Sequence, residues 1–297
     1  MNTAGSAVLV EAPRGGARTR HRLGRVRHGI GRVGVYAFLI GGAALVLLPY
    51  LWMVSASLRP ESEVFQTGLN PIPRRIHWQH YADAWRQYPL GRWLANTFLV
   101  ASIETLGTVV TSVLAGFAFA RLRFWGRDAL FYLYLAAMMV PIQVTLIPSF
   151  VIVRQLGLLN TYEGTAIVHL VQFFGVFLMR QFLLDVPSEL EDAARIDGCS
   201  WWGVLWHIFL PICLPAVAAL SILAFTAGWN DFLWPLVVIN RPDIMTVVVG
   251  LASMRGEATP WGPLMAATTI SALPLIGVYV VVQRWFTEGL TMSGIKG

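Results

Sequence analysis

Residues 33–58 read VGVYAFLIGGAALVLLPYLWMVSASL, with no Asp, Glu, Lys or Arg among them. A helix needs about 17–25 mostly apolar residues to cross a bilayer. The run is longer than the roughly 7–15 apolar residues of a signal-peptide core, so we expect it to be retained, although residues 54–56 could imitate a cleavage site. The stretch therefore predicts a membrane-spanning helix near the start of the chain.

Five more apolar runs of similar length follow, at 93–120, 129–153, 162–179, 207–228 and 263–283. Only 13% of the residues are charged, against about 25% in soluble domains. Because lipid offers the backbone no hydrogen-bond partners, each run is expected to be a helix. The sequence predicts an all-α membrane protein with six transmembrane helices. The run 232–239 is too short to span and is expected to be re-entrant or interfacial.

The basic residues indicate the orientation of these helices. With both termini inside, the inner segments hold 14 Lys and Arg residues and the outer loops hold 8. Positive residues concentrate on the cytoplasmic side of membrane proteins. We therefore predict that both termini are cytoplasmic. The outer loop 59–92, with five Arg, runs against this trend.

The first 32 residues carry seven Arg among Gly and Ala. This composition predicts a disordered basic tail at an anionic membrane surface. Nucleic-acid binding is another interpretation of such a run, but a membrane span follows at once, so no nucleic-acid partner is expected. The predicted organisation is a tail over 1–32, a six-helix domain over 33–285 and a cytoplasmic tail over 286–297.

Lysine is nearly absent, since Lys296 is the single one and Gly297 follows it. A phosphate-binding loop of the Walker type requires Lys followed by Ser or Thr. Any ATP that drives this protein must therefore bind to another chain. The two cysteines, Cys199 and Cys213, have no metal-ligand spacing, so we expect neither a metal nor a cofactor on this chain.

The most informative segment lies between the fourth and fifth spans, at residues 187–211. Ser188 and Glu191 fit a capping box, and Gly198 can adopt the left-handed conformation that ends a helix. Ser200 can cap the next helix. The segment predicts a short helix, a sharp bend and a second helix on the cytoplasmic side. From the residues alone, a lever pressed into a partner and an amphipathic helix resting on the membrane are equally good interpretations.

The order of Ala193-Ala194, Gly198 and Ile208-x-Leu210-Pro211 resembles the EAA loop of ABC-importer permeases. The sequence departs from the motif at Asp192, where the family has Glu. In that family the loop is the coupling helix that docks on the ATPase subunit. The resemblance implies a coupling loop over 185–206, with a docking role for Glu191, Asp192, Ala193, Ala194, Asp197, Gly198, Ile208, Leu210 and Pro211.

Segments 156–162, 229–235 and 283–297 resemble the maltose-type and glycerol-phosphate-type permeases of the carbohydrate-uptake branch. The resemblance implies a subunit of the bacterial cytoplasmic membrane that forms half of a sugar pathway and is not itself an enzyme. The implied partners are a second permease, two ATPase subunits carrying ATP and Mg, an extracytoplasmic solute-binding protein and membrane lipid. The sequence does not identify the solute.

Polar residues within or beside the spans are candidates for the substrate pathway. Glu104 is an ionisable group in mid-span, which is costly and commonly functional, although it could simply pair with a neighbouring helix. Gln143 follows Pro141, and broken helices in transporters often line the substrate site. Hydrogen bonding between helices is an equally good role for each candidate. The set is Asn96, Glu104, Gln143, Gln172, Trp229 and Asn230. His169 is interpreted as a packed histidine.

Two other function classes remain open at this stage. An intramembrane enzyme would need a nucleophile with its base, or metal ligands, and the spans offer only Glu104 and His169 as strong candidates. A secondary transporter usually consists of two related halves, and the sequence shows no clear repeat. Purified alone, the chain should show neither hydrolysis nor uptake.

Overall fold

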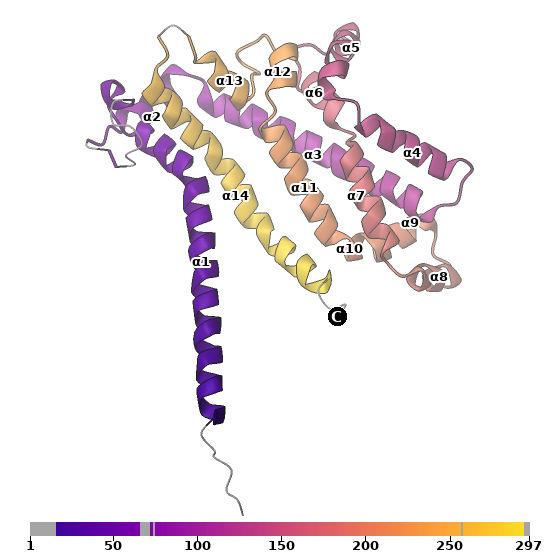
Figure 1. The fold of residues 1–297 in the computed structure, drawn as a ribbon. Coiled ribbons are helices and arrows are strands. Elements are labelled where there is room, and N and C mark those ends of the chain that lie inside the picture. The colour runs from indigo at the N-terminus through magenta and orange to yellow at the C-terminus, as the bar shows by residue number, and fades with distance from the viewer. Residues whose placement is uncertain (1–15, 66–71, 74, 257, 294–297) are drawn as a thin grey trace, which may run out of the picture.

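A computed structural model describes residues 16–65, 72–73, 75–256 and 258–293. Within these residues every regular element is a helix and no strand occurs (Figure 1). The predicted all-α class is therefore confirmed. The predicted apolar runs fall on single helices or on pairs of helices with a short break between them, because a helix satisfies its own backbone polar groups without water.

Three helices contain an unbroken stretch that is long and apolar enough to cross a membrane. They are α1 (Gly16–Ser57), through its part Gly34–Ser57, α3 (Leu90–Arg121), and α14 (Trp261–Ser293), through its part Trp261–Val281. Three further pairs of helices pass the same test together but are bent. If each bent pair is one span, the described residues contain six, which is the predicted number.

The first bent pair shows why a span breaks. It consists of α4 (Arg127–Met138) and α5 (Ile142–Gln155), which meet at 99°. Pro141 immediately precedes α5, and it has the extended backbone typical of the residue before a helix. Proline cannot donate the hydrogen bond that would continue α4. The break predicted at Pro141 is thus confirmed.

The other two pairs bend less. The 47° pair joins α6 (Tyr162–Ala166) and the 3₁₀ turn η2 (Ile167–His169) to α7 (Phe173–Leu184). The 77° pair joins the stretch Trp201–Ile212 to α11 (Leu214–Trp229). That stretch comprises α9 (Trp201–Val204), the π-helix η3 (Leu205–Phe209) and α10 (Leu210–Ile212).

Helix α3 lies at the centre of the bundle, where it packs along α7 and α11 (Figure 1). The close approach depends on Gly116 of α3 and Gly228 of α11. A Cβ atom at 116 would lie 2.7 Å from Met179 Cβ, and one at 228 would lie 2.3 Å from Glu104 Oε2. Small residues that let helix backbones approach are typical of contacts within membranes.

Short elements cover the end of the bundle opposite α8 (Ser188–Ile196) (Figure 1). They are η1 (Glu61–Glu63), α2 (Gln79–Gln87), α12 (Leu233–Val238) and α13 (Val247–Ser253). The Glu61 carboxylate accepts hydrogen bonds from the backbone N–H groups of Trp261 and Gly262, at 2.6 and 2.9 Å. It thereby caps the start of α14 and ties η1 to it.

The two ends of the chain differ from the predicted organisation. Helix α1 begins at Gly16, so the half of the predicted disordered tail at 16–32 is helical, and residues 1–15 lie outside the described residues. At the other end α14 continues to Ser293, so the predicted tail 286–297 is helical in its described part. Both differences have one cause: a helix already stabilised within the span can continue beyond the apolar run at little cost.

Candidate functional site

The segment predicted as a coupling loop forms a short helix, a bend and a second helix, as expected. Helix α8 starts at Ser188 with Glu189 and Glu191 in its first turn, which suits the positive end of the helix dipole. The predicted capping box is wrong, because the structure shows no side-chain hydrogen bond that caps this helix. Glu191 instead faces α3, where its Oε2 lies 3.6 Å from Arg121 Nη1.

The bend lies at Gly198, whose φ of +87° is in the left-handed region that disfavours residues with a Cβ. The backbone N–H of Cys199 returns to the carbonyl of Ala194 at 2.9 Å, which closes the end of α8. The Ser200 hydroxyl accepts a hydrogen bond from the N–H of Gly203 and caps α9. The predicted bend and the predicted second cap are both confirmed.

The two neighbouring alanines of α8 lie on different sides of the helix. Ala194 is buried in the apolar cluster with Val204, Leu205 and Phe209. Ala193 is exposed. It shares its side of the helix with other exposed residues at helical spacing. We define the α8 face as Glu189, Asp192, Ala193 and Ile196, the last being 86% exposed.

Arg121, at the end of α3, is a residue that the sequence interpretation missed. Its guanidinium donates hydrogen bonds to the carbonyls of Leu183 and Val186, just where α7 leads into α8. It also lies beside Glu191 and 4.6 Å from the ring centre of Phe209. Partial burial raises the pKa of the Glu191 carboxyl, and the Arg121 charge opposes that shift. Arg121 therefore joins α3 to three elements of the loop region.

The second half of the predicted motif lies away from the α8 face. Ile208, in the π-helix, and Leu210, in α10, are half-buried against the apolar cluster beneath α8. Pro211 is exposed at the start of α10. Ile208 and Leu210 pack beneath α8, so they lie apart from the exposed α8 face. A π-helix within a longer helix is frequent at functional sites.

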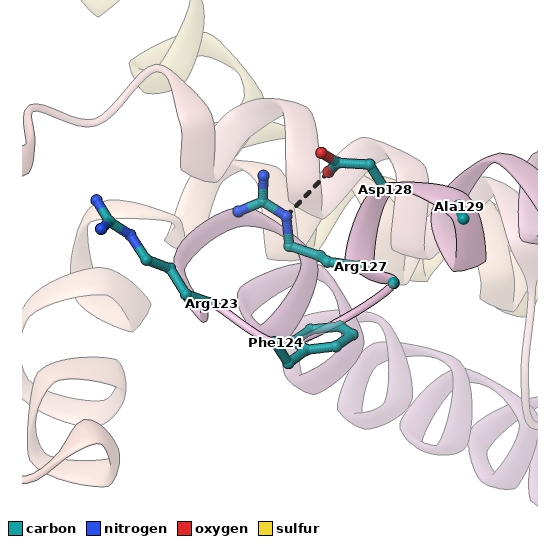
Figure 2. Close-up of a pocket in the computed structure, with 6 residues that line it drawn as sticks. Arg123, Phe124, Arg127, Asp128 and Ala129 are labelled. Carbon is teal, nitrogen blue, oxygen red and sulfur yellow. Dashed lines mark hydrogen bonds and ion pairs between the residues drawn. The ribbon is translucent and has the colours of Figure 1, made fainter.

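A shallow pocket of about 420 Å³ opens at the turn between α3 and α4. Figure 2 shows Arg123 and Phe124 on this turn, with the ion pair between Arg127 and Asp128 beside them, at 2.9 Å. Trp125 on the same turn is 99% exposed. Arg and Trp together are typical of residues at the membrane–water interface.

Three ionisable side chains from different parts of the chain converge in the bundle. His169 Nε2, at the end of η2, lies 3.2 Å from Asp231 Oδ2, just after α11. Glu104 of α3 is 2% exposed and interacts electrostatically with both. His169 is therefore packed, as predicted, but against a charged partner. The sequence interpretation did not single out Asp231, although it is the first charged residue after the fifth apolar run.

A pocket of about 470 Å³ opens beside this cluster, at the break between η2 and α7. Gln172 and His169 lie in its wall together with Ser149, and Trp234 and Phe173 provide aromatic surface. Concave sites with mostly apolar walls and a few convergent polar groups are typical of small-molecule binding. Of the predicted pathway residues, Gln172 lines this pocket and Glu104 lies behind its His169.

The other predicted pathway residues lie elsewhere. Asn96 is buried and fully bonded, since it donates to the carbonyls of Asp243 and Met245 and accepts from the Tyr162 hydroxyl. Trp229 is buried and donates to the Ser271 carbonyl. These two hold helices together. Gln143 and Asn230 are exposed on α5 and after α11.

Within the residues that the structure describes, no three His, Cys, Asp or Glu side chains are placed to hold a metal ion. Cys199 and Cys213 are free thiols.

The chain is similar to known transport proteins. Residues 109–291 match the family described as binding-protein-dependent transport system inner membrane component. The sn-glycerol-3-phosphate transport system permease protein UgpE of Yersinia pestis bv. Antiqua is 35% identical over 87% of this chain and 95% of its own. The arabinooligosaccharides transport system permease protein AraQ of Halalkalibacterium halodurans is 34% identical over 88% and 94%.

Among solved structures, a bacterial ABC transporter involved in the import of alginate contains a chain of the same fold. The TM-score is 0.76 at 24% identity, over 88% of this chain and 98% of that chain. The family match covers more than half of the present sequence, and the relatives align over nearly their full length. The chain therefore belongs to the family of inner membrane components of binding-protein-dependent transport systems.

Proposed function

We propose that this chain is the permease subunit of an ATP-driven importer of sugars or sugar-like solutes and forms half of the pathway. Its relatives UgpE and AraQ carry the names of glycerol-phosphate and arabino-oligosaccharide transport systems. These names support a carbohydrate-like solute without choosing between charged and neutral ones.

The observation that carries the proposal is the α8 face. It is a continuous strip of two carboxylates, one small residue and one exposed isoleucine, Ile196, on a helix held firmly from behind by Ala194. A surface of this kind, with little side-chain bulk at Ala193 and charge at its edge, allows another protein to approach the helix closely and fixes its register by charge. We assign this strip to the ATPase subunit, which would hold ATP and Mg. Asp197 and Gly198 end the helix, and Ile208, Leu210 and Pro211 support it.

The proposed orientation places the end of the bundle that carries α8 on the cytoplasmic side. The start of α1 and the end of α14 lie at that same end (Figure 1). The inner segments predicted from the sequence carry more basic residues than the outer loops, which supports a cytoplasmic location for this end. The opposite end, with α2, α12 and α13, would then receive the extracytoplasmic solute-binding protein.

Assembly with a second permease subunit is supported by α1. Its side chains from Gly34 to Leu51 are all exposed in this chain, and Figure 1 shows the helix running away from the bundle. Helix α1 packs against α14, but an exposed apolar stretch such as residues 34–51 must be covered by lipid or by another subunit. Both are among the proposed partners.

The solute path would pass the pocket beside the η2–α7 break. Its wall combines hydrogen-bonding groups of Gln172 and His169 with the aromatic surface of Trp234 and Phe173, which are the groups that a sugar ring needs. His169 pairs with Asp231 at 3.2 Å, and Glu104 interacts electrostatically with both. Gln143 and Asn230 remain candidates on exposed surfaces.

The substitution Ala193→Arg tests the docking assignment. It places a long cation at the centre of the α8 face without disturbing the buried side of the helix. We expect loss of the ATPase subunit on co-purification and loss of uptake in vesicles, while the permease stays in the membrane. Ala193→Ser, which keeps the residue small, is the matched control and should retain both. Normal retention and uptake by the Arg variant would show that the ATPase docks elsewhere.

A further inference from the structure

Helix α3 is the central span, and it has no break. It runs from Leu90 to Arg121, which corresponds to roughly 48 Å at 1.5 Å per residue. The spans that pack around it along α7 and α11 belong to bent pairs. An unbroken helix among bent pairs can carry a displacement from one membrane face to the other without absorbing it at a break.

The inner end of α3 is anchored to the loop region by one residue. Arg121 is only 9% exposed, and it holds the carbonyls of Leu183 and Val186 together with the carboxylate of Glu191. Charge-assisted hydrogen bonds of this kind are stronger than neutral ones. Any tilt of α8 must therefore either move the end of α3 or break these contacts.

The outer end of α3 is anchored just as firmly to the loop that precedes α13. The indole N–H of Trp93 donates to the carbonyl of Pro242 at 3.2 Å. The buried hydroxyl of Thr97 accepts a hydrogen bond from the backbone N–H of Val247 at 2.7 Å. Asn96 adds its two bonds to the same loop, at 3.0 Å each. A helix and a loop joined by four hydrogen bonds move together.

We infer that α3 is a rigid rod linking the outer loop 242–247 to α8, with Thr97 and Arg121 as the positioning residues at its two ends. The inference rests on the proposed function, since it takes α8 as the ATPase contact and the outer end as the binding-protein contact. Coupling between two binding sites is reciprocal. Docking at the outer loop would thus shift α8, and movement of α8 would shift the outer loop.

A double-mutant cycle on the assembled transporter tests the rod. Thr97→Val removes the acceptor for Val247, and Arg121→Gln removes the charge and most donors at the other end. The matched controls are Thr105→Val, whose hydroxyl bonds only within α3, and Arg127→Gln, whose partners are its neighbour Asp128 and the carbonyl of Leu122 in the same turn. Complexes in nanodiscs are assayed for ATP hydrolysis with and without the liganded binding protein.

We expect each rod variant to assemble and to keep its basal hydrolysis. The stimulation of ATP hydrolysis by the liganded binding protein should fall by roughly 2- to 30-fold in each variant, the range seen for mutations along coupling networks. The two sites are 24 residues apart, about 36 Å along the helix. Independent sites at that distance would multiply their effects. In a rod, loosening either end interrupts the same path, so stimulation in the double variant should match that in the more impaired single variant within about twofold.

Effects that multiply in the double variant would overturn the rod, as would controls that lose stimulation to the same degree as Thr97→Val and Arg121→Gln. If Arg121→Gln does not assemble, Glu191→Gln takes its place in the cycle, because it removes only the ion pair. A wild-type complex that shows no stimulation by any binding protein would instead contradict the proposed function. The two failures are therefore distinguishable.

Discussion

Adjacent residues of α8 have different structural roles, which the sequence alone does not reveal. Ala193 is exposed, whereas Ala194 is 7% exposed and packs in the apolar cluster with Val204 and Phe209. The sequence interpretation assigned both alanines to docking, because one turn of a short helix does not reveal which side faces the rest of the chain. Adjacent side chains on a helix point about 100° apart, so a shift of one position changes a side chain from exposed to buried.

Ala194→Arg should therefore damage the permease itself. The cluster has no room for a long side chain, and overpacking alone costs about 1–3 kcal/mol. We expect a lower midpoint of thermal unfolding for the purified permease, whereas Ala193→Arg should leave the midpoint unchanged. Equal midpoints for the two variants would contradict the assignment of sides.

Gly198→Val should disrupt the bend between α8 and α9. At φ +87° a β-branched residue is strained, and the left-handed conformation costs roughly 1–2 kcal/mol for residues other than glycine. Gly198→Asn should be tolerated better, because Asn adopts this region more readily. Gly203→Ala is a control in ordinary helical space. Uptake should be normal in the Gly203 variant, reduced in Gly198→Asn and lowest in Gly198→Val. Full uptake by Gly198→Val would show that transport does not require a left-handed bend.

Glu104→Gln should reduce uptake without reducing membrane insertion. The substitution keeps the shape of the side chain but removes a carboxylate from the cluster with His169 and Asp231. Glu163→Gln, an exposed change in the first turn of α6, is the control. Uptake rates and protein levels in membranes are compared. Unchanged uptake by the Glu104 variant would reduce this residue to a packing role.

At the scale of elements, the sequence predicts where the helices lie better than where they break. Pro141 predicts the break before α5. The break between η2 and α7 has no such signal, because Leu170, Val171 and Gln172 include neither Pro nor Gly. There the hydroxyls of Thr108 and Thr111 on α3 donate hydrogen bonds to the carbonyls of His169 and Leu170. These bonds replace the helix bonds that are missing at the break. Tertiary contacts decide this break, and they are invisible in a local pattern.

The contact between α3 and α7 gives a prediction with a matched control. A methyl group at Gly116 would lie 2.7 Å from Met179 Cβ and 3.0 Å from the backbone N of Arg180. We expect Gly116→Ala to lower the midpoint of thermal unfolding. Gly277→Ala, on α14 with no atom within 4 Å of the new methyl, should leave the midpoint unchanged or slightly raised. Equal effects would show that α3 and α7 do not pack as described.

At the scale of the whole molecule, the chain is a transport subunit, and ATP hydrolysis is expected on a separate chain. The sequence predicted the fold class and the family, because long apolar runs and an ordered motif are local features. It did not predict Arg121 as the link to α8, since the residues that Arg121 holds lie 62 to 70 positions further along the chain. Contacts of that separation depend on the packing of whole helices.

Purified alone and reconstituted in vesicles, the chain should neither hydrolyse ATP nor accumulate sugar. No Walker lysine is available, and Lys296 is followed by Gly297. Both activities should appear only when the second permease, the ATPase subunits and the binding protein are added together. Hydrolysis by the chain alone would contradict its role as a passive gate.

The break between α4 and α5 bears on how the membrane remains electrically insulating. Its residues Met139 and Val140 are 83% and 49% exposed in this chain, and their backbone N–H groups bond to the carbonyls three residues back, those of Ala136 and Ala137, instead of four back as in an α-helix. Irregular backbone at membrane depth is tolerated only when protein or water surrounds it. If the chain forms half of the pathway, as proposed, water could reach this break in the isolated subunit and ions could leak beside α4. In the proposed assembly, the surface of the second permease subunit would cover the break and keep the membrane insulating.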